Sequence, residues 1–312
     1  MSYNYSELTF PSSDGKNRVF AEIYMPKTVS AKAVVQLSHG MIDYVTRYKG
    51  LAEYLTENGY IFAGNHHLGH GKTAASEEDF GFFAAKDGVK YLLKDLHSMN
   101  KQLRAMFPAL PVIMLGHSMG SFLARLYVEK YPHDLCGVII HGTSGPNRLI
   151  PFGKLAVGVR RMMKGERYRS SFITKLVFGS YNSKYPKSEG KLAWLTRDTG
   201  AVNGKYTDKY ASFKFTLAGY SDLFDMIARS NSSEWFAKYP KDMPTLIVSG
   251  AADPVGKYGK GPTYVYKKLL MARLSRVSLK LYDGARHELF NETNRNDFCR
   301  DLVAWLDGVA KW

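Results

Sequence analysis

The chain alternates between short apolar runs and helix-length segments, and this alternation limits its possible folds more than any other feature. The runs predicted as strands lie at 33–38, 60–64, 111–115, 135–140, 245–249 and 277–282. The segments predicted as helices lie at about 47–58, 86–106, 119–131, 258–274 and 292–309. Nearly continuous apolar strands that alternate with helices indicate a mostly parallel sheet buried on both faces. We therefore expect an α/β fold in which helices flank a central sheet.

Two further apolar runs, at 7–10 and 18–25, precede this pattern. They flank the segment Ser12-Ser13-Asp14-Gly15-Lys16, which is rich in turn-forming residues. The two runs are therefore predicted to form an antiparallel hairpin at the edge of the sheet.

The alternation stops between about 143 and 240, in a stretch rich in Lys, Arg, Tyr, Phe and Gly. A structureless loop of this length is uncommon, so we expect a small helical subdomain. It lies between the strand ending near His141 and the strand starting near Pro244, and is expected to cover the carboxyl ends of the strands, where open α/β sheets bind ligands. The predicted organisation is a core of residues 1–142 and 241–312 with a helical cap, or lid, inserted at 143–240.

The segment Gly116-His117-Ser118-Met119-Gly120 follows an apolar strand and begins a predicted helix. It fits the pattern G-x-S-x-G, in which a sharp strand-to-helix turn raises the serine hydroxyl above the sheet. Such a strained turn admits only small residues two positions before and after the serine, hence Gly116 and Gly120. We therefore predict that Ser118 is the nucleophile of an α/β-hydrolase fold. The alternative is an ordinary helix start that Ser118 merely caps.

A serine hydroxyl is a weak nucleophile without a base, and His287 is the expected base because it follows the last strand and its turn. Asp253, just past the run 245–249, is the expected carboxylate that orients the imidazole. The order Ser118, Asp253, His287 is that of the α/β hydrolases. The alternative for Asp253 is an Asp-Pro turn. Other acidic residues are weaker candidates, because they neighbour His287 in the chain or lie in the predicted cap: Asp283, Glu288, Asp222 and Asp225.

Acyl transfer also needs hydrogen-bond donors for the developing oxyanion. One is expected to be the backbone N–H of Met119, directly after the nucleophile, and the other that of Met41, in the loop Ser38-His39-Gly40-Met41 after the first buried strand. The alternative for this loop is a plain strand-ending turn. The side chains predicted to contact substrate are His39, His117, His141, Phe178 and Phe215.

Neither a metal nor a cofactor is expected. His66, His67 and His70 lie close together in the chain, but no set of acidic partners accompanies them. They are therefore interpreted as a polar turn after the strand 60–64. His117 is expected to point into the turn at Ser118 and away from its hydroxyl.

The net charge is +15, from 43 basic and 28 acidic residues. Residues 151–214 hold 14 Lys/Arg and 4 Asp/Glu, so about two-thirds of the excess lies in the predicted cap. A basic surface attracts anions, so weak contact with an anionic membrane surface is one interpretation and a solvated surface is the other. Nucleic acid is not an expected partner, because no nucleic-acid-binding motif accompanies the charge. The oligomeric state is left open.

The chain contains two cysteines, Cys136 in a predicted strand and Cys299 in a predicted helix. We interpret them as buried free thiols, which fits a reducing cytoplasm. The sequence shows no signal peptide and no run of the roughly 18 apolar residues that a membrane helix needs. A cytoplasmic location is therefore expected.

With these residues in hand, the chain resembles the monoacylglycerol lipase and lysophospholipase branch of the α/β hydrolases, a group also described as serine-aminopeptidase-like. The likeness covers about 33–142 and 244–309 and rests on five segments: Ser38–Met41, His67-Leu68-Gly69-His70-Gly71-Lys72-Thr73, Gly116–Gly120, Gly250–Pro254 and Gly284–His287. It implies the triad Ser118, Asp253 and His287, an oxyanion hole at Met41 and Met119, ester hydrolysis and no cofactor. Ser121 departs from the pattern, since many relatives have glycine there.

The predicted function is hydrolysis of carboxylic esters of monoacylglycerols, lysophospholipids or similar single-chain lipids, through an acyl-enzyme on Ser118. An esterase for small or aromatic acyl groups, a thioesterase or a peptidase would use the same triad. An inactive binding module would lack a triad member, and none is missing. Epoxide hydrolases and dehalogenases would carry Asp in place of Ser118. The cap sets substrate choice, so the sequence leaves the substrate open.

Overall fold

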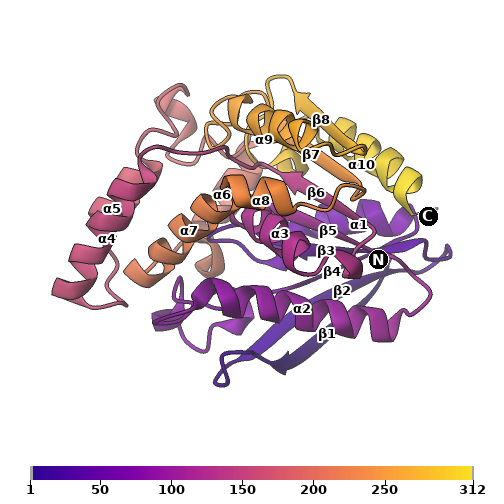
Figure 1. The fold of residues 1–312 in the computed structure, drawn as a ribbon, viewed down its shortest axis with the longest axis horizontal. Helices are drawn as coiled ribbons and strands as arrows, with labels where there is room; N and C mark the ends of the chain where they lie inside the picture. The colour runs from indigo at the N-terminus through magenta and orange to yellow at the C-terminus, as the bar shows by residue number, and fades with distance from the viewer. Residues whose placement is uncertain (1–2, 311–312) are drawn as a thin grey trace.

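An eight-stranded sheet forms the centre of the structure, a computed structural model that describes residues 3–310 (Figure 1). The strands are β1 (Tyr3–Pro11), β2 (Arg18–Pro26), β3 (Ala33–Ser38), β4 (Tyr60–Asn65), β5 (Val112–His117), β6 (Gly137–His141), β7 (Thr245–Gly250) and β8 (Val277–Tyr282). Their order across the sheet is β1-β2-β4-β3-β5-β6-β7-β8. β2 runs antiparallel to β1 and β4, and the remaining neighbours are parallel. The predicted α/β fold with a mostly parallel sheet is confirmed.

Burial along the strands follows their place in the sheet. Every residue of β3, β4 and β5 is buried, as expected for strands covered on both faces. β8 lies at an edge, and its residues alternate between half-buried and exposed over most of its length. The predicted hairpin is also confirmed, since β1 pairs with β2 and forms the other edge.

Helices cover both faces of the sheet. α1 (Lys49–Glu57) and α10 (Arg295–Val309) pack their apolar residues against one face. α2 (Gly88–Met106), α3 (Met119–Lys130) and α9 (Lys260–Met271) pack against the other. α9 is shorter than predicted, since Gly259 precedes it with a φ of 82° that an α-helix does not adopt. These two layers hold the loops at the carboxyl ends of the strands, where the predicted site residues lie.

Five α-helices lie between β6 and β7. They are α4 (Ile150–Lys164), α5 (Ser171–Phe178), α6 (Thr199–Thr207), α7 (Leu217–Ser230) and α8 (Ser233–Lys238). Side chains of Ser170, Asp198, Thr216 and Ser232 accept hydrogen bonds from the first turns of α5, α6, α7 and α8 and so fix where these helices begin. α7 packs against α2, α3 and α4, while α4 and α5 lie furthest from the sheet (Figure 1). Part of the apolar residues of this segment, among them Ile150, Val157 and Leu223, therefore join the same buried cluster as those of α2 and α3.

Both cysteines are free thiols, but Cys136 differs from the expectation. It precedes β6, because that strand begins at Gly137, and it is only half-buried. Cys299 lies on α10 and is buried. Among residues 3–310, no helix has both the length and the apolar character required to cross a membrane. Residues 1–2 and 311–312 of the predicted core lie outside the described residues.

Candidate active site

Ser118 occupies the turn between β5 and α3. Its backbone has φ 54° and ψ −118°, a strained conformation for a residue with a side chain. The Ser118 N–H donates to the carbonyl oxygen of His141 (2.9 Å), which ties the turn to the neighbouring strand. The Ser118 hydroxyl makes no capping hydrogen bond to α3, which leaves it free for another role.

The two glycines of the turn are required by close packing. A Cβ atom on Gly120 would overlap the carbonyl oxygen of Ser38, and one on Gly116 would lie 2.6 Å from the Cβ of Ala124. Ser121, the position next to Gly120, is accommodated because its hydroxyl donates to the carbonyl oxygen of Ser118 (2.6 Å). The geometry matches the sharp turn that the motif predicts.

Asp253, in the loop after β7, contacts His287, in the loop after β8. The Nδ1 of His287 lies 2.8 Å from Oδ2 of Asp253, and both side chains are buried. Oδ1 of Asp253 accepts the N–H of Val255 (2.8 Å), and Oδ2 also lies 3.3 Å from the hydroxyl of Ser249. Because an aspartate oxygen accepts at this contact, Nδ1 carries the imidazole proton. The lone pair of His287 is therefore on Nε2.

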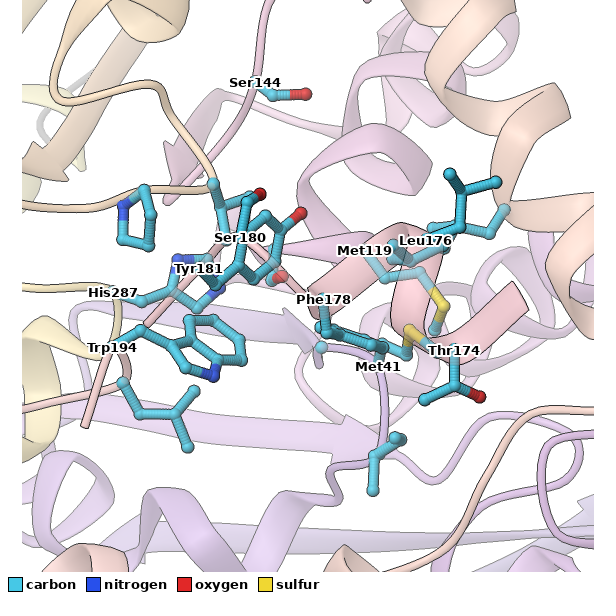
Figure 2. Close-up of a pocket in the computed structure, with 18 of the residues that line it drawn as sticks. Met41, Met119, Ser144, Thr174, Leu176, Phe178, Ser180, Tyr181, Trp194 and His287 are labelled. Atoms are coloured by element: carbon cyan, nitrogen blue, oxygen red, sulfur yellow. The ribbon is translucent and has the colours of Figure 1, made fainter. Parts of the chain in front are cut away.

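Ser118 and His287 line the same cavity. Nε2 of His287 is buried and has no hydrogen-bond partner among the described residues. The indole of Trp194 packs beside the imidazole, with ring centres 5.2 Å apart (Figure 2). An imidazole that is oriented by a carboxylate and left unpaired at Nε2 can act as a general base. The hydrogen bond between such a base and its serine often tightens only when substrate is bound.

Met41 and Met119 also line the cavity beside Ser118. Met119 is the first residue of α3, where a backbone N–H has no partner within the helix. Met41 lies in the turn after β3, and neither N–H is bonded within residues 3–310. The backbone at Gly40 packs so closely on Ser118 that an added Cβ would lie 3.3 Å from the serine Cβ. Met41 and Met119 thus carry the two backbone donors that the sequence predicts for the oxyanion, and both residues line the cavity with Ser118.

Three histidines hold the loop that carries Met41. Nε2 of His39 accepts the N–H of His67 (2.9 Å), and Nε2 of His70 accepts the N–H of Ile42 (3.3 Å). Nδ1 of His39 then donates to the carbonyl oxygen of Gly40 (2.9 Å). Burial lowers the pKa of His39 well below its ordinary value and that of His70 to about 4, so both rings stay neutral acceptors near pH 7. These histidines fasten the loop after β3 to the turn after β4.

A metal site is not found in the described part of the chain, where no group of three or more His, Cys, Asp or Glu side chains converges on one point. His66 instead contacts Oε1 of Glu22 through Nε2 (2.9 Å) and accepts the N–H of Lys72 at Nδ1 (2.9 Å). The run of histidines after β4 forms a hydrogen-bonded turn.

The cavity over Ser118 has a volume of about 1230 Å³, which exceeds the usual range of ligand pockets, about 300–1,000 Å³. Much of its wall is apolar and comes from the segment between β6 and β7: Leu149, Ile150, Phe152, Phe172, Leu176, Val177, Phe178, Phe213, Leu223 and Phe224. Figure 2 labels Phe178 and Leu176 among the lining side chains, together with Met41 and Met119. The cavity therefore joins the nucleophile to a long apolar chamber.

Two of the five predicted substrate contacts, His117 and Phe178, line the cavity. The other three do not. His39 is enclosed by the hydrogen bonds to its loop, His141 stacks on Phe298 (5.4 Å), and Phe215 packs beneath Gly81. All three are fully buried and lie outside the lining of the cavity in this structure, so their contact with substrate stays a prediction. A polar or aromatic residue at a strand end can face the core as readily as the ligand.

A cluster of charged side chains forms one wall of the cavity next to His287. Asp43, Lys205 and Glu288 line the cavity, whereas Arg47 does not line it but contacts the two carboxylates. Arg47 pairs with Asp43 (2.8 Å) and Glu288 (2.9 Å), while Nζ of Lys205 lies 3.6 Å from Glu288. Sequence reasoning missed this cluster, although Asp43 and Arg47 follow Met41 closely and Glu288 directly follows His287.

The charges of this cluster are balanced. Burial, and then the positive charge of Arg47, lower the pKa of Lys205. Burial alone would raise the pKa of Glu288, but Arg47 and Lys205 hold it below its ordinary value. Two cations thus face two carboxylates, and Lys205 keeps hydrogen-bond donors near the catalytic candidates.

The remaining acidic candidates lie in other settings. Asp283 is exposed, and Glu288 points to Arg47 and not to the imidazole. Asp222 and Asp225 lie on α7, and Asp225 pairs with Lys154. Within the described chain only Asp253 of these residues contacts a ring nitrogen of His287.

Comparisons with known proteins agree with this geometry. Residues 29–294 match the family model described as serine aminopeptidase, S33. Human monoglyceride lipase is 26% identical over 91% of this chain and 85% of its own length. Monoacylglycerol lipase of Mycolicibacterium smegmatis is 24% identical over 98% of both chains. The crystal structure of a thermostable carboxyl esterase from Bacillus coagulans with glycerol superimposes with a TM-score of 0.90 at 28% identity, over 98% of this chain and 99% of that one.

The family model covers most of the chain, including the turn of Ser118 and the loops of Asp253 and His287. The sheet order and the superposition on solved esterase structures agree with it over nearly the whole chain. The chain therefore belongs to the serine aminopeptidase S33 family and is a hydrolase with the α/β-hydrolase fold.

Proposed function

We propose that this enzyme hydrolyses the carboxylic ester of monoacylglycerols, with Ser118, Asp253 and His287 as its triad. The observation that carries the proposal is the contact between Nδ1 of His287 and Asp253 (2.8 Å) beside a strained Ser118 that opens into an apolar cavity. The relatives named monoglyceride or monoacylglycerol lipase support the same chemistry.

The proposed mechanism follows from the positions of these groups. Nε2 of His287 takes the proton of Ser118 as the serine oxygen attacks the ester carbonyl, and Asp253 stabilises the imidazolium. The N–H groups of Met41 and Met119 bind the oxyanion. His287 then gives the proton to the departing alcohol, which leaves an acyl-enzyme. Water, deprotonated by the same Nε2, cleaves the acyl-enzyme to release the fatty acid and restore the serine.

The two ends of the cavity support a substrate with one apolar chain and an uncharged polar head. The apolar wall fits an acyl chain, and the wall formed by Asp43, Lys205 and Glu288 offers both donors and acceptors to hydroxyl groups. The hydroxyls of a glycerol head can both donate to the carboxylates and accept from Lys205 at this wall. The comparison of head groups below separates it from the phosphocholine head of a lysophospholipid.

We also propose that residues 143–240 act as a cap on a core of residues 1–142 and 241–312 and that this cap contacts anionic membrane surfaces. Large apolar side chains at 3–4-residue spacing form an exposed stripe on α4, with Phe152 70% exposed and Met162 84% exposed. The rest of the stripe and its extension onto α5 are Leu155, Val159, Met163, Phe172 and Leu176. Basic residues alternate with it along the chain (Lys154, Arg160, Arg161, Lys164 and Lys175), as on helices that lie in a membrane interface.

We infer a cytoplasmic location as well. The free thiols of Cys136 and Cys299 support it, because reduced cysteines are typical of cytoplasmic proteins.

The decisive test compares hydrolysis rates for monoacylglycerols, matching lysophosphatidylcholines and p-nitrophenyl esters over a series of acyl chain lengths. We expect long-chain monoacylglycerols to give the highest kcat/KM. A preference for short or aromatic acyl groups, for thioesters or for peptides would contradict the assignment.

The variant Ser118→Ala tests whether Ser118 is the nucleophile. We expect it to lose a factor of about 10⁴ or more in kcat with unchanged folding, since its hydroxyl has no structural hydrogen bond to α3. Retained ester hydrolysis in a clean preparation would show that Ser118 is not the nucleophile.

A further inference from the structure

Residues 193–198, which precede α6 and which we call the strap, bind the loop of His287 on both sides of that residue. The N–H of Glu288 donates to the carbonyl oxygen of Leu195 (2.7 Å). The N–H of Arg286 donates to Oε1 of Glu292 (2.8 Å). Arg197 of the strap donates two hydrogen bonds to the same carboxylate, from its backbone N–H (3.2 Å) and from its Nε (2.8 Å). The N–H groups of residues 286 and 288, one on each side of His287, are thus tied to the strap directly or through one carboxylate.

Further contacts join the strap to the same loop. The guanidinium of Arg286 donates to the carbonyl oxygen of Ala193 (2.7 Å), and the hydroxyl of Thr196 donates to the carbonyl oxygen of Asn291 (2.8 Å). The indole of Trp194 packs on the imidazole itself (Figure 2). The strap therefore touches the loop before, at and after the proposed base.

Glu292 is the centre of these contacts. Its side chain is 1% exposed, and its two oxygens accept from Arg286, Arg197 and Thr293. A buried carboxylate that lost one of these partners would be left partly unsatisfied, which is costly in a low-dielectric interior. The carboxylate consequently fixes the spacing between the strap and the backbone of residue 286.

We propose that Arg197 and Glu292 are positioning residues for His287, so that the segment between β6 and β7 holds the catalytic base as well as covering the substrate. The proposal rests on the role of His287 as the base. Nε2 of His287 has no partner in the described chain, so its aim at Ser118 depends on the contact with Asp253 and on the backbone of the loop. A displacement of about 1 Å in such a group lowers rates by about 100-fold.

The test uses Arg197→Met, which keeps the backbone donor and the apolar stem but removes the guanidinium. A soluble p-nitrophenyl ester gives kcat and KM, a fluorophosphonate probe gives the rate at which Ser118 is labelled, and proton NMR follows the downfield Nδ1–H of His287. We expect kcat and the labelling rate to fall by about 10- to 100-fold, KM to change by less than about twofold, and the downfield signal to broaden or move. Arg197→Lys should restore part of the rate.

The matched control is Arg167→Met. Arg167 also joins the segment between β6 and β7 to the core by an ion pair, with Asp79 (2.9 Å), but its partner is remote in sequence from the loop of His287. This variant should keep the kcat, the labelling rate and the NMR signal of the wild type. A milder second variant, Thr196→Val, removes the hydrogen bond to Asn291 and the bond that the Thr196 hydroxyl accepts from the N–H of Asp198 (3.0 Å), and should lower kcat by a few-fold in a folded protein.

Three outcomes would overturn the proposal. The first is a folded Arg197→Met with wild-type kcat and an unchanged His287 signal. The second is an equal loss in Arg167→Met, which would indicate a general effect of cap stability. If Arg197→Met does not fold, an unchanged kcat in Thr196→Val would count against the proposal in the same way. A wild-type enzyme that the probe does not label at Ser118 would instead overturn the proposed function together with this inference.

Discussion

At the scale of single residues, the turn at Ser118 is governed by the space around its glycines. A methyl group on Gly120 would overlap the carbonyl oxygen of Ser38, while Gly158 on α4 has open space around it and an ordinary helical backbone. We predict that Gly120→Ala lowers the free energy of unfolding by about 3 kcal/mol or more, or prevents folding. Gly158→Ala should raise it by up to about 1 kcal/mol. Urea unfolding of both variants measures the difference, and equal effects would contradict the packing argument.

The carboxylate of the triad gives a second test at this scale. Asp253→Asn keeps the shape of the side chain but no longer favours the tautomer with its proton on Nδ1, so we expect kcat to fall by about 10⁴-fold. The matched variant Asp283→Asn changes an exposed carboxylate in the same loop as His287 and should leave kcat unchanged. If the two effects were exchanged, Asp283 would be the functional acid.

Single residues also show what a sequence can and cannot predict. The order and strand-end positions of Ser118, Asp253 and His287 are local features, so each could be identified from its neighbours in the chain. Glu292 and Arg197 meet across 95 positions, and Lys205 meets Glu288 across a similar distance. Such pairs carry no local signal, because a charged residue in a loop or helix is usually solvated. The same limitation applies to His39, His141 and Phe215, whose position outside the lining of the cavity has no local signal in the sequence.

At the scale of elements, prediction succeeded where hydrophobic periodicity is strong. β3 to β5 are mostly apolar, and α1 and α2 have a clear apolar face, so their positions follow from pattern alone. The segment between β6 and β7 lacks this signal. α6 buries only Val202 and Lys205, and its start is set by the capping side chain of Asp198. Tertiary packing and caps define these helices, so their bounds could not be read from the sequence.

The junction of α7 and α2 predicts a pH dependence. Asp222 on α7 lies against Gly88, the first residue of α2, and burial together with Asp225 raises the pKa of its carboxyl to about 7. Between about pH 4 and 7 the folded state then keeps a proton that the unfolded state has released. The group therefore lowers stability as pH rises through this range, at about 1.4 kcal/mol for each unit of pKa difference.

Thermal unfolding at pH 5 and pH 7.5 tests this linkage. We predict that Asp222→Asn stabilises the protein at pH 7.5 by at least about 1 kcal/mol relative to its effect at pH 5. Asp225→Asn changes a half-exposed carboxylate on the same helix and should produce a smaller dependence on pH. A pH-independent effect of Asp222→Asn would mean that its carboxyl is already ionised at pH 5.

At the scale of the whole molecule, charge and apolar surface coincide. About two-thirds of the net charge of +15 lies within residues 151–214, the stretch that also exposes the apolar stripe of α4 and α5. These helices lie at the end of the molecule remote from α10 and the C-terminal end (Figure 1). A basic surface at one end would orient the protein on an anionic bilayer with its cavity facing the lipid.

Vesicle binding separates this directed contact from a general effect of positive charge. Lys164→Gln/Lys175→Gln removes two exposed charges beside the stripe, while Lys27→Gln/Lys101→Gln removes two exposed charges elsewhere. We predict that the first pair weakens binding to anionic vesicles by about 10-fold or more, at about 1 kcal/mol for each charge, and that the second pair has a much smaller effect. Binding of the wild type should weaken between 0.05 and 0.5 M salt, because the Debye length shortens from above about 10 Å to a few ångströms. If both pairs lost the same vesicle affinity, net charge alone would be the cause. If the wild type bound neutral and anionic vesicles equally well, the basic surface would serve only solvation.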